Sequence, residues 1–180
     1  MMEPSMPGIA GVHLVHLDPH EDPRGSLTEV FRRSWLPEAS EVVQINLSRS
    51  RAGVLRGLHF HREQADYWCV LSGRAVVGLF DLREDSPTHR RKAEILIDTE
   101  QERLGLYIPP GVAHGFFAET DMTLAYLVDR YFTGQDEFGL AWDDPDVGLT
   151  WPSGEPLLSD RDRSNPSLEE ALAHARRSEP

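Results

Sequence analysis

Residues 66–82 read DYWCVL-SG-RAVVGLFDL, two apolar runs of strand length on either side of the pair Ser72-Gly73. A Ser-Gly pair between two such runs is typical of a β-hairpin. Similar short runs, separated by turn signals, surround this segment at residues 41–48, 94–98, 105–108, 116–118 and 123–128. No long helical pattern lies between them. Closely spaced strands of this kind predict an all-β sandwich or barrel, whose mouth can hold a small ligand.

The last forty residues depart from this pattern. Residues 143–156 combine Asp-Pro, Trp-Pro and Glu-Pro pairs, which predict an irregular loop. Ser167, followed three residues later by Glu170, has the spacing of a helix capping box. We expect a short helix from this point to Arg177, with basic residues in its last turn, where the helix dipole favours them.

Composition limits the function classes. The chain has 180 residues and a formal net charge of −12, and it is long enough for one domain with a real core. The acidic balance argues against nucleic-acid binding, which needs clustered Lys and Arg. No apolar run approaches the ~20 residues that span a bilayer, and the first eight residues lack signal-peptide features. Cys69 is the single cysteine, which excludes an internal disulfide. We therefore expect a soluble cytoplasmic protein without nucleic-acid or membrane partners.

Histidines in the middle of the chain are the first candidates for chemistry. In residues 54–61 (VLRGLHFH), His59 and His61 are two positions apart and would share one face of a strand. Arg56 is three positions from His59 and need not share that face. A histidine titrates near neutrality and can take a proton from a carbon next to a carbonyl group. Alone, the pair is equally compatible with ordinary surface or core histidines.

Three further segments add candidates. The turn at residues 109–111 (PPG) delivers His114 to the start of the next strand. Tyr126 lies within a predicted strand, where a tyrosine is more often a packing residue than an acid. Residues 157–162 (LLSDRD) are compatible with a solvated charged loop. They are also compatible with a carboxylate that orients a histidine, next to an arginine that meets a phosphate.

Taken together, these segments resemble the dTDP-4-dehydrorhamnose 3,5-epimerase family of nucleotide-sugar epimerases, from about Gly11 to Pro166. The resemblance rests on an ordered set of motifs: DPRG at 22–25 with Glu29, QIN at 44–46, VLRGLHF at 54–60, DLR at 81–83, SPT at 86–88, YIP at 107–109, AHG at 113–115, DDPD at 143–146, WP at 151–152 and LSDRD at 158–162. No single motif is decisive, but the order of the whole set is highly specific.

The resemblance implies a cupin-type jelly roll, usually a homodimer, that acts on a dTDP-4-keto-6-deoxyhexose without a cofactor. The 4-keto group acidifies the C3 and C5 protons, a base removes one to form an enolate, and an acid returns a proton to the opposite face. We accordingly expect residues 1–10 to be a flexible N-terminus, residues 11–166 to be the jelly-roll domain and residues 167–180 to be a C-terminal helical tail.

The family's functional residues carry over to this chain by position. His59 resembles the base, Asp162 the carboxylate that pairs with it, and Tyr126 the acid. A larger set falls on substrate-binding positions: Arg24, Glu29, Gln44, Asn46, Arg56, Asp66, His114, Glu137 and Arg161. Among these, the arginines are the expected contacts to the nucleotide diphosphate and the sugar, since a few focused arginines can hold an anion on an acidic protein.

The segment around Asp66 departs from the family pattern. Members normally have a lysine after Gln-Ala, where this chain has Asp66, and many have glutamine where this chain has His61. The family's lysine contacts the sugar and helps to stabilise the enolate, whereas an ionised aspartate would oppose negative charge there. The substrate range, and even the reaction, is therefore open.

The same departure creates a second pattern. His59, His61 and Asp66 resemble the first metal motif of the wider cupin superfamily, with Asp in place of Glu, and the segment that ends in His114 resembles the second. Three imidazoles and a carboxylate suit Fe, Mn, Ni or Zn, and a divalent ion would be the Lewis acid that the lysine no longer supplies. Against this, Asp66 can simply make a polar contact, and His59 would have to leave Asp162 to bind a metal.

Three functional hypotheses result. The first is a cofactor-independent epimerase of a dTDP-4-keto-6-deoxyhexose, acting at C3, C5 or both, in deoxysugar biosynthesis of the dTDP-rhamnose type. The second is a metal-dependent cupin isomerase that acts on a related nucleotide sugar. The third is a catalytically silent protein that binds a sugar nucleotide, against which the presence of His59, Tyr126 and Asp162 weighs.

Overall fold

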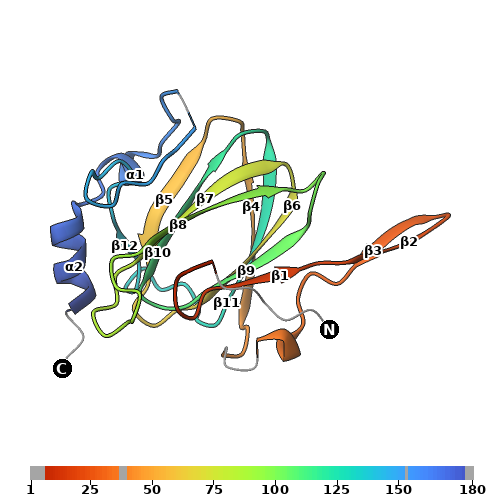
Figure 1. Ribbon diagram of the computed structural model, residues 1–180, viewed down its shortest axis with the longest axis horizontal. Coiled ribbons are helices and arrows are strands. Elements are labelled where there is room, and N and C mark those ends of the chain that lie inside the picture. Colours follow the sequence, from red (N-terminus) through yellow and green to blue (C-terminus); the bar gives the residue numbers. More distant parts are fainter. Residues whose placement is uncertain (1–6, 37–39, 153, 177–180) are drawn as a thin grey trace.

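The computed structural model describes residues 7–36, 40–152 and 154–176, and it consists mainly of two antiparallel five-stranded sheets (Figure 1). The first sheet has the strand order β1 (His13–His16), β9 (Leu104–Ile108), β6 (Asp66–Ser72), β11 (Met122–Val128) and β4 (Gln44–Ser50). The second has the order β12 (Phe138–Gly139), β5 (Leu55–Phe60), β10 (Val112–Ala118), β7 (Arg74–Asp81) and β8 (Lys92–Asp98). The all-β architecture predicted from the sequence is confirmed.

Smaller elements lie outside the two sheets. Strands β2 (Pro19–Asp22) and β3 (Gly25–Thr28) pair only with each other and form an arm that projects away from the sheets (Figure 1). The 3-10 helix η1 (Arg33–Trp35) follows this arm, and the helices α1 (Asp160–Arg163) and α2 (Leu168–Arg176) end the described part of the chain. Among the described residues, no helix has the length and apolar character needed to cross a membrane.

The core between the sheets changes character along the strands. On β6, the inward positions run from Asp66 through Trp68 to Val70, and Val70 is buried in the main apolar cluster. On β10, they run from His114 through Phe116 to Ala118 in the same way. Burial of these inward apolar side chains stabilises the end of the sandwich that holds Val70 and Ala118, at roughly 25 cal/mol per Å² removed from water. The polar end of the same strands is left to form a cavity.

The Ser72-Gly73 turn is not the hairpin that the sequence predicts. Strand β6 pairs with β9 and β11, whereas β7 pairs with β8 and β10, so the turn carries the chain from one sheet to the other. Gly73 has φ +97°, and a Cβ there would lie 2.5 Å from the Asp121 carbonyl oxygen. Only glycine therefore fits this corner. The local sequence correctly predicts a turn at this point. The pairing of the two strands is set instead by the neighbouring strands that bury both of their faces.

The tail agrees with its sequence pattern over the described residues. Ser167 Oγ donates to Glu170 Oε2 at 3.0 Å and its N–H does so at 3.1 Å, which confirms the capping box. Helix α2 begins at Leu168, and the predicted end at Arg177 lies outside the described residues. The described parts of the loop at 143–156 hold no helix or strand. At the other end of the chain, Ile9 is fully buried in the apolar core. Ile9 therefore anchors this end of the described chain to the core, and the predicted domain limits stay a prediction.

The tight corner at Gly73 leads to a first prediction. Gly73→Ala should lower the free energy of unfolding by at least about 2 kcal/mol, because it adds a backbone clash to an unfavourable φ. Gly53 is the matched control, since it has φ +82° but a Cβ added there would meet no atom within 4 Å. Gly53→Ala should cost only about 1 kcal/mol. Urea unfolding of both variants measures the difference, and equal losses would contradict the steric argument.

Candidate active site

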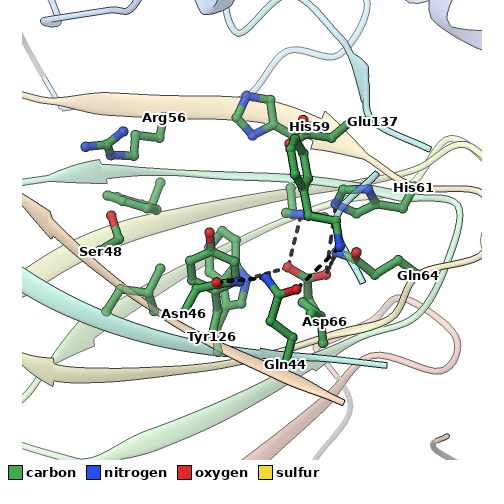
Figure 2. Close-up of a pocket in the computed structure, with 16 residues that line it drawn as sticks. Gln44, Asn46, Ser48, Arg56, His59, His61, Gln64, Asp66, Tyr126 and Glu137 are labelled. Atoms are coloured by element: carbon green, nitrogen blue, oxygen red, sulfur yellow. Dashed lines mark hydrogen bonds and ion pairs between the residues drawn. The ribbon is translucent and has the colours of Figure 1, made fainter. Parts of the chain in front are cut away.

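A cavity of about 390 Å³ lies between the polar ends of the two sheets (Figure 2). The first sheet contributes alternate side chains of three strands: Gln44, Asn46 and Ser48 of β4, Asp66 and Trp68 of β6, and Leu124, Tyr126 and Val128 of β11. The second sheet contributes Arg56 and His59 of β5 and His114 and Phe116 of β10. This arrangement follows from the period of two in a strand, which directs every second side chain to the same face.

His59 is paired with a buried carboxylate. Its Nε2–H donates to Asp162 Oδ1 at 2.6 Å, and the two residues are 103 positions apart in the chain. Asp162 is 4% exposed and lies in α1, where its own N–H donates to the N-cap hydroxyl of Ser159. Because Nε2 carries the hydrogen of this bond, Nδ1 is the basic nitrogen of the neutral ring. A histidine oriented in this way by a carboxylate can act as a general base.

The charge of Asp162 is stabilised locally. Burial opposes its ionisation most strongly, but the hydrogen bonds from His59, Ser159 and the Gly57 backbone, together with the charge of His59, outweigh burial and lower the pKa of Asp162 below 3.8. The carboxylate is therefore ionised at neutral pH, where it stabilises an imidazolium on His59.

An irregular pairing brings Arg56 onto the same face as His59. Between β5 and β10, His59 is opposite His114 and Arg56 is opposite Phe116, so three positions on one strand match two on the other. Without this shift, residues three apart would point to opposite faces. The Arg56 guanidinium donates to Ser50 Oγ at 3.0 Å, which holds it at the edge of the cavity. The sequence alone left this point open.

Tyr126 lies on the opposite sheet from His59. It is opposite Asn46 on one side and Trp68 on the other, so the three form one row across the first sheet. Burial, and then the neighbouring carboxylates of Asp66 and Glu137, raise the pKa of Tyr126 above 10, while Arg56 acts in the other direction. The phenol therefore stays protonated at neutral pH and can serve as a proton donor.

Asp66 is the buried polar centre of the cavity. It is 4% exposed, and it accepts hydrogen bonds from Gln64 Nε2 at 2.8 Å and from Trp68 Nε1 at 3.0 Å. The Nε2 atoms of His61 and His114 are each 3.9 Å from one of its oxygens. Burial lowers the pKa of His114 to about 4, although the Asp66 charge opposes this shift. His114 is therefore neutral at pH 7.

Three of the expected substrate-binding residues do not line the cavity. Arg24 and Glu29 are exposed on or just after the β2–β3 arm, and Arg24 is bound to Asp22 instead, with Nη2 and Oδ2 2.5 Å apart. Arg161 donates to Glu137 at 2.9 Å, and of these two only Glu137 reaches the cavity. The structure brings together the remaining expected residues: Gln44, Asn46, Arg56, His59, Asp66, His114, Tyr126 and Glu137, with Asp162 behind His59.

Several lining residues were not singled out by the sequence analysis. Ser48 continues the alternation of Gln44 and Asn46 along β4, and Trp68 continues that of Asp66 along β6, so the period of two could have found both. Gln64 and Phe132 lie outside the strands and carry no such signal.

Comparison with known proteins identifies the family. A family model described as dTDP-4-dehydrorhamnose 3,5-epimerase matches residues 7–170. The chain belongs to this epimerase family. It is 39% identical over 165 residues to the dTDP-4-dehydrorhamnose 3,5-epimerase of Mycobacterium tuberculosis, over 86% of this chain and 81% of the relative. The resemblance inferred from the sequence motifs is thereby confirmed.

Solved structures of epimerases share the fold. The Mycobacterium tuberculosis rmlC epimerase has a TM-score of 0.89 and 35% identity, over 96% of this chain and 92% of that chain. ChmJ, a 3'-monoepimerase from Streptomyces bikiniensis solved in complex with dTDP-quinovose, has a TM-score of 0.86 and 33% identity, over 96% and 90%. The predicted cupin-type jelly roll of this epimerase family is therefore confirmed.

The lowered pKa of Asp162 leads to a second prediction. A carboxylate with a depressed folded-state pKa contributes stability that is present above about pH 4 and is lost on acidification. The free energy of unfolding of the wild type should therefore fall from pH 5 to pH 3, and Asp162→Asn should show a flatter profile. Urea unfolding across this range measures both. Asp160→Asn, on the exposed side of α1, is the control and should follow the wild type. Parallel profiles for Asp162→Asn and wild type would contradict the prediction.

Proposed function

We propose that this protein epimerises a dTDP-4-keto-6-deoxyhexose at C3, C5 or both through an enolate, in deoxysugar biosynthesis of the dTDP-rhamnose type. One observation carries the proposal. His59, which is paired with Asp162 of α1, belongs to the second sheet and Tyr126 to the first, and His59 and Tyr126 line the same cavity. A sugar ring held between the sheets would have a base on one face and an acid on the other. Inversion of a carbon centre requires this arrangement.

The proposed steps use these two residues. His59 Nδ1 takes the proton from the carbon next to the 4-keto group, and the electron pair of the broken C–H bond moves into the enolate. Asp162 stabilises the imidazolium that forms. The phenol of Tyr126 then gives its proton to the same carbon from the opposite face, and solvent restores the starting protonation states. These proton transfers need no organic cofactor.

Other cavity residues are proposed to bind the substrate. Gln44 and Asn46 are joined by a hydrogen bond of 2.9 Å and present polar groups beside Tyr126. Arg56 is the cationic group at the edge of the cavity and is suited to the diphosphate. Glu137, with Arg161 bound to it, forms another part of the edge. The cytoplasmic location inferred from the sequence stays a prediction.

Single-position epimerisation is the second candidate. It is favoured by the acidic side chain of Asp66 within the cavity and by the similarity to a 3'-monoepimerase. Because an ionised carboxylate opposes enolate formation nearby, one of the two enolates can be disfavoured while the other still forms.

The third prediction tests the reaction itself. Proton NMR of dTDP-4-keto-6-deoxyglucose with the protein in D₂O should show deuterium entering C3, C5 or both. His59→Asn and Tyr126→Phe should each lower turnover by about 10²–10⁴-fold, the usual contribution of a general base or acid. Tyr131→Phe is the matched control, since Tyr131 is 70% exposed, and it should retain wild-type turnover. Tight binding of the substrate without exchange at either carbon would overturn the proposal and favour the silent binding protein.

We further propose that the active form is a homodimer in which the β2–β3 arm of each protomer reaches the partner's cavity. Strand β4 is the outer strand of its sheet, and its outward side chains Ile45 and Leu47 are 67% and 61% exposed. Exposed apolar side chains on an edge strand are a site for association. The arm carries exposed Leu27 and the expected substrate contact Arg24, which does not line its own cavity.

The fourth prediction concerns this dimer. The double variant Ile45→Asp and Leu47→Asp should be monomeric in analytical ultracentrifugation, because two buried charges would disfavour the interface. Leu96→Asp is the matched control on β8 of the other sheet, where Leu96 is 48% exposed, and it should remain dimeric. A monomeric wild type would contradict the proposal.

Mixed dimers test the exchange of arms. Arg24→Ala impairs the arm and His59→Asn impairs the cavity. In a dimer of one Arg24→Ala protomer and one His59→Asn protomer, the unaltered cavity receives an unaltered arm only if the protomers exchange arms. Refolding an equal mixture should then restore about a quarter of the wild-type activity. No recovery above the single variants would show that each arm serves its own cavity or none.

A further inference from the structure

Two imidazoles and one carboxylate converge at the buried side of the cavity. His61, Asp66 and His114 are 7%, 4% and 4% exposed. One nitrogen of each histidine and one carboxylate oxygen all lie within 4.8 Å of one another. His114 comes from β10 of one sheet and Asp66 from β6 of the other, so the cluster spans the space between the sheets. Figure 2 shows His61 and Asp66 within the cavity.

The hydrogen bonds behind the rings determine which nitrogen faces the carboxylate. His61 Nδ1 is 2.6 Å from the Asp136 carbonyl oxygen, and His114 Nδ1 is 2.9 Å from the Val112 carbonyl oxygen. A carbonyl oxygen only accepts, so both Nδ1 atoms must carry hydrogen. In the neutral rings, both Nε2 atoms therefore direct a lone pair toward Asp66.

With both rings neutral, neither Nε2 atom offers the Asp66 carboxylate a hydrogen or a positive charge. Two lone-pair nitrogens face a carboxylate at 3.9 Å on each side, which is too long for a hydrogen bond. A cation between the three groups would accept a lone pair from each of them. Ligands at about 2.1 Å from an ion are roughly 3.0–3.4 Å from one another. The 3.9 Å distances would therefore shorten by about half an ångström, and the widest separation, within 4.8 Å, by up to about 1.5 Å.

The surroundings also suit a metal ligand set. Metal-binding histidines usually donate their second N–H to a carbonyl or carboxylate, and metal-binding carboxylates are themselves hydrogen-bonded. Both histidines here donate Nδ1–H to backbone carbonyls, and Asp66 accepts one bond on each oxygen, from Gln64 and Trp68. Each carboxylate oxygen keeps a lone pair for an ion. His59 is not part of the set, because the ligand atoms that lie within 4.8 Å of one another belong to His61, Asp66 and His114.

We propose that His61, Asp66 and His114 bind a divalent transition-metal ion. Imidazole and carboxylate ligands together suit Zn²⁺, Fe²⁺, Co²⁺, Mn²⁺ or Ni²⁺ rather than Ca²⁺ or Mg²⁺, which prefer oxygen. Three protein ligands leave a coordination position open toward the cavity, where the ion would stabilise negative charge on an oxygen of a bound ligand. The site goes beyond the proposed epimerisation, and its occupancy can be measured without substrate.

The experiment uses Co²⁺ and Zn²⁺ as probes on the full chain without a histidine tag. Equilibrium dialysis should give one ion per chain, and Co²⁺ should produce visible d–d absorption that Zn²⁺ removes by competition. Asp66→Asn and His61→Asn should each weaken binding by at least about 100-fold, since each removes a ligand. His59→Asn is the matched control in the same cavity and should bind Co²⁺ as the wild type does.

Other outcomes overturn the proposal. One is a wild-type protein that binds less than one Co²⁺ ion per ten chains at 100 μM Co²⁺. The other is a loss of Co²⁺ affinity that is the same in His61→Asn as in His59→Asn. Circular dichroism confirms that each variant is folded.

If Asp66→Asn does not fold, His61→Gln provides the test, because its amide can still donate to the Asp136 carbonyl. Loss of deuterium exchange in His59→Asn with retained Co²⁺ binding would separate the metal site from the proposed proton transfers.

Discussion

The change from polar to apolar side chains along the inward faces of β6, β10 and β11 is the constraint on which the rest of the structure depends. Asp66, His114 and Tyr126 are at one end of these strands, and Val70, Ala118 and Met122 are at the other. Between them, Trp68, Phe116 and Leu124 belong both to the apolar core and to the wall of the cavity. The packed side chains that stabilise the sandwich therefore also form the wall of the cavity next to the polar groups. A site built on strands in this way holds its side chains with little freedom.

The charged groups around the cavity differ in how strongly their partners hold them. The chain is acidic overall, and the three arginines expected to contact the substrate already have partners in the structure: Arg56 contacts Ser50, Arg161 contacts Glu137 and Arg24 contacts Asp22. The ion pairs of Arg24 and Arg161 are exposed and contribute little to stability, because solvent screens them. A diphosphate can therefore compete for the guanidinium groups at small cost. The pair of His59 and Asp162 is different, because Asp162 is buried and would keep an unpaired charge if His59 were removed.

Local patterns predicted much of the fold and part of the site. Alternation and turn signals located most of the strands, Ser167 and Glu170 predicted the capping box, and the spacing of His59 and His61 correctly placed both on one face. Such local patterns could not predict how distant segments pair. The turn at Gly73 joins two sheets rather than two paired strands, and the register shift that turns Arg56 toward the cavity depends on β10. The contact between His59 and Asp162 was expected only through the family resemblance, since no periodicity connects residues 103 positions apart.

The position of Asp162 in the chain also has a consequence for biosynthesis. Every described strand precedes Asp162 in the sequence, so all the strands leave the ribosome before the carboxylate that orients His59. Both sheets can therefore assemble around a cavity whose histidine is not yet fixed by its partner. Docking of α1 then completes the pair after the walls have formed. A nascent chain would thus possess its sheets before His59 gains the hydrogen bond to Asp162 that fixes its ring.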